Sequence, residues 1–188
     1  MALFRRKADP DAPRLGIYIH IPFCVRKCDY CDFYSIPGRD GRMDEYLHAL
    51  EVHIAESAPQ AELYTVNTIY FGPVFESLWH GYDTSDYYRT DSRLGSMKDF
   101  QKVFRALKEN GFKIVLDGVF NHVGRGFEPF RDLQEKGEAS IYKDWFCNVH
   151  FGSSTPLGDA FSYDTWQGNW ELVKLNLKNK AVVDHLLG

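Results

Sequence analysis

Residues 112–120 read FKIVLDGVF, a short apolar run that contains β-branched residues and is followed directly by Asn121 and His122. Such a run predicts a buried strand. The segment before it, residues 96–110, has an apolar stripe at i, i+3, i+4 and i+7, with Ser96 as a helix N-cap and Gly111 as a stop. A helix that is followed directly by a buried strand indicates an α/β fold.

The same alternation continues toward the N-terminus. Residues 68–71 (TIYF) and 15–21 (LGIYIHI) have the composition of strands, and residues 43–57 have helical periodicity. The order β-α-β-α-β predicts an α/β fold with about three parallel strands joined by right-handed crossover helices. Residues 1–14 are polar and predict a flexible lead-in. The sixty residues after the third strand predict a long irregular excursion, either a loop or a small subdomain, and a last helix is expected near Asn179.

Composition and charge exclude several classes of protein. The chain has 188 residues, a net charge of −4 and 44% hydrophobic residues, which is typical of one globular domain. An acidic balance gives no electrostatic basis for a nucleic-acid partner. No stretch approaches 18 apolar residues, and no apolar run follows the basic residues near the N-terminus. We therefore expect no membrane association and a cytoplasmic location.

Three of the four cysteines form a tight cluster, Cys24, Cys28 and Cys31, with the spacing C-x3-C-x2-C. Three thiolates on one short loop are suited to three irons of a 4Fe–4S cluster, which leaves the fourth iron open. A zinc site is the main alternative, with His20 or Cys147 as the fourth ligand. Three unrelated loop cysteines remain the third interpretation.

The sequence around these cysteines is YIHIPFC at 18–24, CDYCDF at 28–33 and VNTIYFG at 66–72. Residues 15–72 resemble the radical S-adenosylmethionine enzymes, in particular the oxygen-independent coproporphyrinogen oxidase and heme-chaperone family. The resemblance implies a cluster on the three cysteines and S-adenosylmethionine on the open iron, with cofactor contacts from Tyr18, Phe33 and Gly72. That family continues into a Gly-Gly-Gly-Thr-Pro turn, whereas Pro73 follows Gly72 here and has no N–H to donate.

A second set of motifs begins near Tyr70: GPVFES at 72–77, HGYDT at 80–84, DSRLG at 91–95, DGVFNH at 117–122 and KLN at 174–176. Residues 70–188 resemble the alpha-amylase superfamily of glycoside hydrolases, which implies a partial (βα) TIM-type barrel and an alpha-glucan substrate. The resemblance implies that Tyr82 stacks on a sugar, that His122 binds its hydroxyls, and that Asp83 belongs to the same site. Asp117 and Asn121 would brace it, with calcium beside Asn121.

Glycoside hydrolysis requires two positioned carboxylates, and the superfamily carries them on later strands than those found here. The sequence therefore predicts a fusion of a lead-in (1–14), a radical S-adenosylmethionine-like segment (15–72) and a glycosidase segment (73–188), without complete catalysis. One alternative is an iron–sulfur and S-adenosylmethionine-binding protein. Another is an alpha-glucan hydrolase piece that needs further barrel strands. Open sheet edges favour self-association.

Overall fold

The computed structural model describes residues 11–19, 23–24, 34, 36–37 and 41–188. The chain divides into two compact units. Unit 1 comprises residues 1–72 and 98–117, and unit 2 comprises residues 73–97 and 118–188. Residues 98–117, which lie in the predicted glycosidase segment, belong to unit 1.

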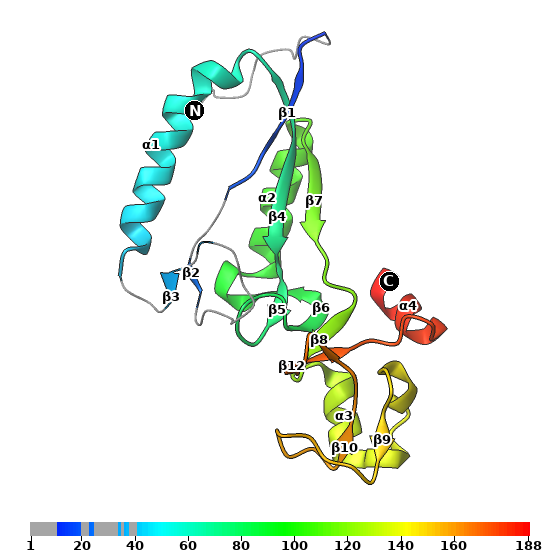
Figure 1. Ribbon diagram of the computed structural model, residues 1–188. Helices are drawn as coiled ribbons and strands as arrows, with labels where there is room; N and C mark the ends of the chain where they lie inside the picture. Colours follow the sequence, from blue (N-terminus) through cyan, green and yellow to red (C-terminus); the bar gives the residue numbers. More distant parts are fainter. Residues whose placement is uncertain (1–10, 20–22, 25–33, 35, 38–40) are drawn as a thin grey trace. The chain divides into compact units, whose positions relative to one another are not determined.

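Unit 1 contains the predicted alternation of strands and helices. Its sheet has the order β1-β4-β7, in which β1 (Arg14–Ile17) is parallel to β4 (Thr65–Pro73). Figure 1 shows β4 and β7 (Lys113–Asp117) side by side, with their arrows in the same direction. Two further strands, β2 (Phe23–Cys24) and β3 (Ile36–Pro37), form a short parallel pair. The α/β class and the parallel three-stranded sheet are thus confirmed.

The helices of unit 1 agree closely with their predicted ranges. Helix α1 runs from Met43 to Ala61 and α2 from Met97 to Glu109. The Phe104 ring on α2 lies 5.4 Å from the Phe71 ring on β4, so the apolar stripe of α2 faces the sheet. Gly111 follows the helix with a φ angle of +83°, a left-handed conformation that glycine adopts readily. The chain then turns directly into β7.

No described residue of unit 1 is buried. Apolar side chains on both helices and on a strand of the sheet are about half exposed: Leu47 on α1 (46%), Val103 on α2 (49%) and Val115 on β7 (46%). Burial of apolar area is the main force that stabilises a fold. The part of unit 1 that the structure describes therefore has the secondary structure of a barrel segment without a buried core.

Unit 2 holds the buried core and is made of short elements. The antiparallel strands β5 and β6 and the short 3-10 helix η1 lie in residues 73–97, and the other elements lie in residues 118–188. Their bounds are β5 (Phe75–Ser77), β6 (Thr84–Thr90), η1 (Ser92–Leu94), β8 (His122–Gly124), α3 (Glu128–Lys136), η2 (Gly137–Ala139), η3 (Lys143–Trp145), β9 (His150–Phe151), β10 (Phe161–Ser162), β11 (Thr165–Trp166), β12 (Asn169–Lys174) and α4 (Lys180–Leu187). An antiparallel sheet has the order β11-β12-β8, and β9 pairs with β10. The predicted irregular excursion is thus a folded subdomain.

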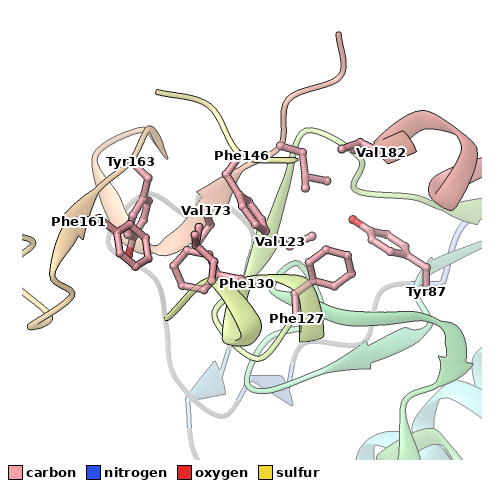
Figure 2. Packing of buried hydrophobic residues seen from close by; sticks show 11 residues of the cluster. Tyr87, Val123, Phe127, Phe130, Phe146, Phe161, Tyr163, Val173 and Val182 are labelled. Carbon is pink, nitrogen blue, oxygen red and sulfur yellow. The ribbon is translucent and has the colours of Figure 1, made fainter. Parts of the chain in front are cut away.

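Aromatic side chains form the centre of this core (Figure 2). The Phe130 ring on α3 makes edge-to-face contacts with Phe146, at 5.2 Å, and with Tyr163, at 5.1 Å. The Tyr87 hydroxyl on β6 donates to the Val119 carbonyl at 2.5 Å, which ties the hairpin to the segment before β8. Buried aromatic pairs of this kind add to the burial of apolar area.

A partly buried ion pair fastens the excursion to the residue that follows β8. Both terminal nitrogens of Arg125 donate to the two oxygens of Asp159, at 2.6 and 2.8 Å. Thr155 and Gln134 donate to the same carboxylate. Burial alone would raise the pKa of Asp159, but these donors, Arg125 foremost, hold it well below its usual range. The carboxylate is therefore a structural anchor.

None of the helices in the described residues is long and apolar enough to cross a membrane.

Candidate functional site

The turn between β5 and β6, residues 78–83, carries the predicted sugar-binding tyrosine. Asp83, which is 2% exposed, lies at the end of this turn. Its two carboxylate oxygens accept hydrogen bonds from the backbone N–H groups of Trp79, at 2.8 Å, and His80, at 3.0 Å. A buried carboxylate that accepts backbone N–H groups fixes a turn because each bond is charge-assisted. Asp83 thus shapes the turn from inside.

His80 also serves the turn. Its Nδ1 atom accepts the backbone N–H of Tyr82 at 3.2 Å and lies 3.6 Å from Asp83. Burial lowers the pKa of His80, while the Asp83 charge opposes this shift and Arg93 adds to it. A neutral ring leaves Nδ1 free to accept the Tyr82 N–H.

A second carboxylate braces the turn from its other side. Asp91 is 3% exposed and accepts hydrogen bonds from the Arg93 side chain and from the Ser77 hydroxyl at 3.0 Å. Arg93 also donates to the Trp79 carbonyl at 2.8 Å and to Ser77 Oγ at 2.7 Å. Ser77 Oγ in turn accepts the backbone N–H of Gly81 at 3.1 Å. We call Ser77, Asp91 and Arg93 the outer brace.

His122, the first residue of β8, joins the turn to the rest of unit 2. Its Nε2 atom lies 3.0 Å from the Tyr82 carbonyl oxygen, and its Nδ1 atom lies 2.7 Å from the Asn121 amide nitrogen. A carbonyl oxygen only accepts, so Nε2 carries the proton and Nδ1 accepts from Asn121. Burial lowers the pKa of His122 to about 4, so the ring is neutral near pH 7.

Two partly exposed aromatic residues contact this histidine, Trp166 through its ring and Tyr82 through its backbone carbonyl. Tyr82 is 37% exposed, and Trp166, on β11, is 38% exposed. The Trp166 ring stacks on the His122 ring, with centroids 5.5 Å apart and planes 23° apart. Both residues are therefore partly exposed to solvent, and the Tyr82 backbone carbonyl accepts a hydrogen bond from His122. Trp166 and the outer brace are site features that the sequence interpretation did not assign, although DSRLG at 91–95 marked the place of Asp91 and Arg93.

The structure brings together four of the predicted glycosidase residues, Tyr82, Asp83, Asn121 and His122, all in unit 2. Asp117 belongs to unit 1, where its carboxylate accepts the Tyr70 hydroxyl at 2.7 Å. Their roles toward a sugar stay predictions.

The predicted cofactor residues lie in unit 1 or outside the described residues. Tyr18 is 61% exposed, with its ring 6.2 Å from that of Tyr70. A Cβ atom placed on Gly72 would meet open space. Phe33, Cys28 and Cys31 lie outside the described residues, and Cys24 is described only as part of the backbone of β2.

Within the part of the chain that the structure describes, no group of three or more His, Cys, Asp or Glu side chains is placed to hold a metal ion. The calcium prediction therefore gains no ligand set from the described residues.

A family model described as the alpha amylase catalytic domain matches residues 62–187. Among curated relatives, a cyclomaltodextrinase from Bacillus sp is 40% identical over 65% of this chain and 22% of its own length. Neopullulanase 2 from Thermoactinomyces vulgaris is 43% identical over 71% of this chain and 23% of its own length. The chain thus spans between a fifth and a quarter of the length of the curated relatives it matches.

Solved structures resemble a larger part of the chain. A cyclic alpha-maltosyl-(1→6)-maltose hydrolase from Arthrobacter globiformis, in complex with maltose, matches with a TM-score of 0.64 and 28% identity, over 94% of this chain and 40% of that one. A debranching enzyme from Nostoc punctiforme matches with a TM-score of 0.62 and 30% identity, over 94% of this chain and 37% of that one. Residues 62–187 make up only about two thirds of the chain, so the structural likeness also includes earlier residues.

Proposed function

Because the chain belongs to the alpha-amylase catalytic-domain family, we propose that it forms the opening strands and one sugar-binding surface of an alpha-glucan hydrolase. Relatives named cyclomaltodextrinase and neopullulanase, and a similar structure in complex with maltose, support short or cyclic alpha-glucans as the substrate class. These likenesses favour an alpha-glucan hydrolase piece that needs further barrel strands over a fusion without complete catalysis.

The observation that carries the proposal is how Tyr82 is presented. Its backbone carbonyl accepts the His122 Nε2–H, its backbone N–H is held by His80, and its side chain is 37% exposed. An exposed aromatic ring on a fixed backbone is a suitable platform for the apolar face of a sugar, because little conformational entropy is lost on binding. His122 then supports the platform from beneath.

The buried carboxylates of unit 2 support binding and not bond cleavage. Asp83 accepts two backbone N–H groups, and Asp91 is paired with Arg93. A glycosidase needs one carboxylate as general acid and another as nucleophile or base, both facing the scissile bond. We therefore assign Asp83 and Asp91 to the shape of the site and leave cleavage to carboxylates of later barrel strands.

Titration calorimetry with maltoheptaose tests this proposal on the 188-residue chain. We expect measurable binding that Tyr82→Ala weakens about tenfold, since a stacked aromatic contributes on the order of 1 kcal/mol or more. Tyr64→Ala is the matched control, because Tyr64 is a similarly exposed tyrosine (42%) of unit 1. Binding that is equal in both variants, or as strong for a β-linked glucan such as cellohexaose, would overturn the proposal.

A second candidate function rests on the C-x3-C-x2-C spacing of Cys24, Cys28 and Cys31. We propose that these thiolates hold a 4Fe–4S cluster, with S-adenosylmethionine as its partner. Anaerobic reconstitution should then give about four irons and four sulfides per chain, and Cys28→Ala should lose them. Cys147→Ala is the matched control, because Cys147 lies outside the cysteine cluster. Iron that is unaffected by Cys28→Ala would exclude the cluster.

A further inference from the structure

We propose that Arg93 is a positioning residue for glucan binding: it fixes the turn that presents Tyr82 and never touches the sugar itself. This inference rests on the proposed function, since it assigns to Arg93 the shape of that same site. It also makes the outer brace, and not only His122, a determinant of affinity.

The contacts of Arg93 hold the start of the turn. Its guanidinium donates to Ser77 Oγ, directly before the turn, at 2.7 Å, and to the Trp79 carbonyl, two residues further along, at 2.8 Å. Ser77 Oγ also connects Arg93 to Gly81, because it accepts the backbone N–H of Gly81 at 3.1 Å. Gly81 directly precedes Tyr82, so the brace ends one residue from the binding ring.

Asp91 gives Arg93 its own fixed position. The Arg93 Nε–H donates to Asp91 Oδ1 at 2.7 Å, and a second guanidinium nitrogen donates to Oδ2. The Asp91 carboxylate also accepts the backbone N–H of Arg93 at 2.9 Å. A planar guanidinium that binds a carboxylate through two parallel bonds keeps one orientation, which a lysine ammonium cannot reproduce.

A second set of contacts, from Asp83 and His122, restrains other parts of the turn. Asp83 and His122 hold the backbone at Trp79, His80 and Tyr82 from within unit 2. Gly81 adopts a φ angle of +87°, and a Cβ atom placed on it would lie 3.0 Å from the Pro73 ring. Asp83 and His122 thus hold the backbone at Trp79, His80 and Tyr82, while the outer brace holds it at Gly81.

The test compares Arg93→Met with Lys180→Met. Lys180 is a matched control, since its ammonium donates to both Asp184 oxygens at 2.6 Å on α4, away from residues 78–83 in the sequence. Two readouts are combined: amide hydrogen exchange of the peptide that covers residues 78–83, and the Kd for maltoheptaose. Ser77→Ala is a second variant that removes the link to Gly81 and keeps the Arg93–Asp91 pair.

We expect Arg93→Met and Ser77→Ala to speed exchange in residues 78–83 and to raise the Kd about tenfold, because a turn that must be ordered on binding lowers affinity. Lys180→Met should change neither readout. Faster exchange with an unchanged Kd, or unchanged exchange in both variants, would overturn the inference. If the unaltered chain does not bind maltoheptaose, the proposed function fails, and the exchange data alone decide whether Arg93 fixes the turn.

Discussion

His122 is a buried histidine whose two ring nitrogens are both engaged by the protein. Nε2–H donates to the Tyr82 carbonyl, and Nδ1 accepts from Asn121. Protonation would place two donors face to face at Nδ1, in a site with little access to water. Both the lowered pKa of His122 and its two contacts therefore indicate that the ring is neutral.

This arrangement predicts a pH dependence of stability. Burial lowers the pKa of His122 to about 4, whereas an unfolded histidine has a pKa of about 6.5. Between these values the unfolded chain binds more protons than the folded chain. The contribution of His122 to the free energy of unfolding is therefore fully present above about pH 6.5, and it falls as the pH drops toward 4. The loss amounts to about 3 kcal/mol if the shift is complete.

Urea denaturation at pH 7.0 and at pH 4.5 measures this loss. His122→Gln should remove most of the difference, with a remainder from His80, whose pKa is also lowered by burial. His150→Gln, at an exposed histidine, should leave the difference unchanged. A His122→Gln variant with the full pH dependence would show that the ring is not buried in its neutral form.

Asp83 predicts a stability effect that is confined to unit 2. Asp83→Asn removes a charge-assisted acceptor from two backbone N–H groups, and the amide presents one oxygen where the carboxylate presents two. We expect a loss of about 2 kcal/mol in urea denaturation. Asp86→Asn is the control, because the Asp86 carboxylate accepts one N–H, from Tyr88, at an exposed position. Equal losses in the two variants would contradict the role of Asp83.

At the scale of elements, β8 lies very close to the end of the turn. A Cβ atom placed on Gly124 would lie 2.4 Å from the Asp83 carbonyl oxygen, which is backbone and cannot move aside. Gly124→Ala should therefore destabilise unit 2 by about 3 kcal/mol through overpacking. Thermal denaturation measures the effect, with Gly72→Ala as the control because a Cβ atom there meets open space. A fully stable Gly124→Ala variant would disprove the close approach.

The long, periodic elements were predictable from sequence, and the short ones were not. Helix α2 was expected at 96–110 and runs over Met97–Glu109, because its apolar stripe and Gly111 define both ends. Helix α4 begins after Asn179, whose side chain accepts the Ala181 N–H as an N-cap. Strands β8 to β12 are two to six residues long, which is too short for a visible period.

The site was predictable only in part for the same reason. Family motifs pointed to Tyr82 and His122, but their contact joins residues 40 positions apart, which no local pattern encodes. The sequence did not predict the role of the outer brace, because charged loop residues such as Asp91 and Arg93 are usually solvated. Trp166 has no periodic partner in the sequence, and its place on His122 depends on the sheet formed by β11, β12 and β8.

At the scale of the whole molecule, the two units differ in burial. The buried residues lie in unit 2, and none of the described residues of unit 1 is buried. Local opening should therefore cost less free energy in unit 1. Hydrogen exchange should show faster exchange in α2 and β7 than in β8 and β12. Equal protection in these elements would indicate that unit 1 is covered by a partner or by a second copy.

We propose that unit 2 presents an alpha-glucan-binding surface centred on Tyr82. An amide NMR titration of the chain with maltoheptaose tests that claim most directly, because it locates binding without requiring catalysis. We predict shifts that saturate at the amides of residues 79–83 and 121–124 and in the indole N–H of Trp166, with the amides of α1 unchanged. Shifts that are absent, or that fall mainly in unit 1, would contradict it.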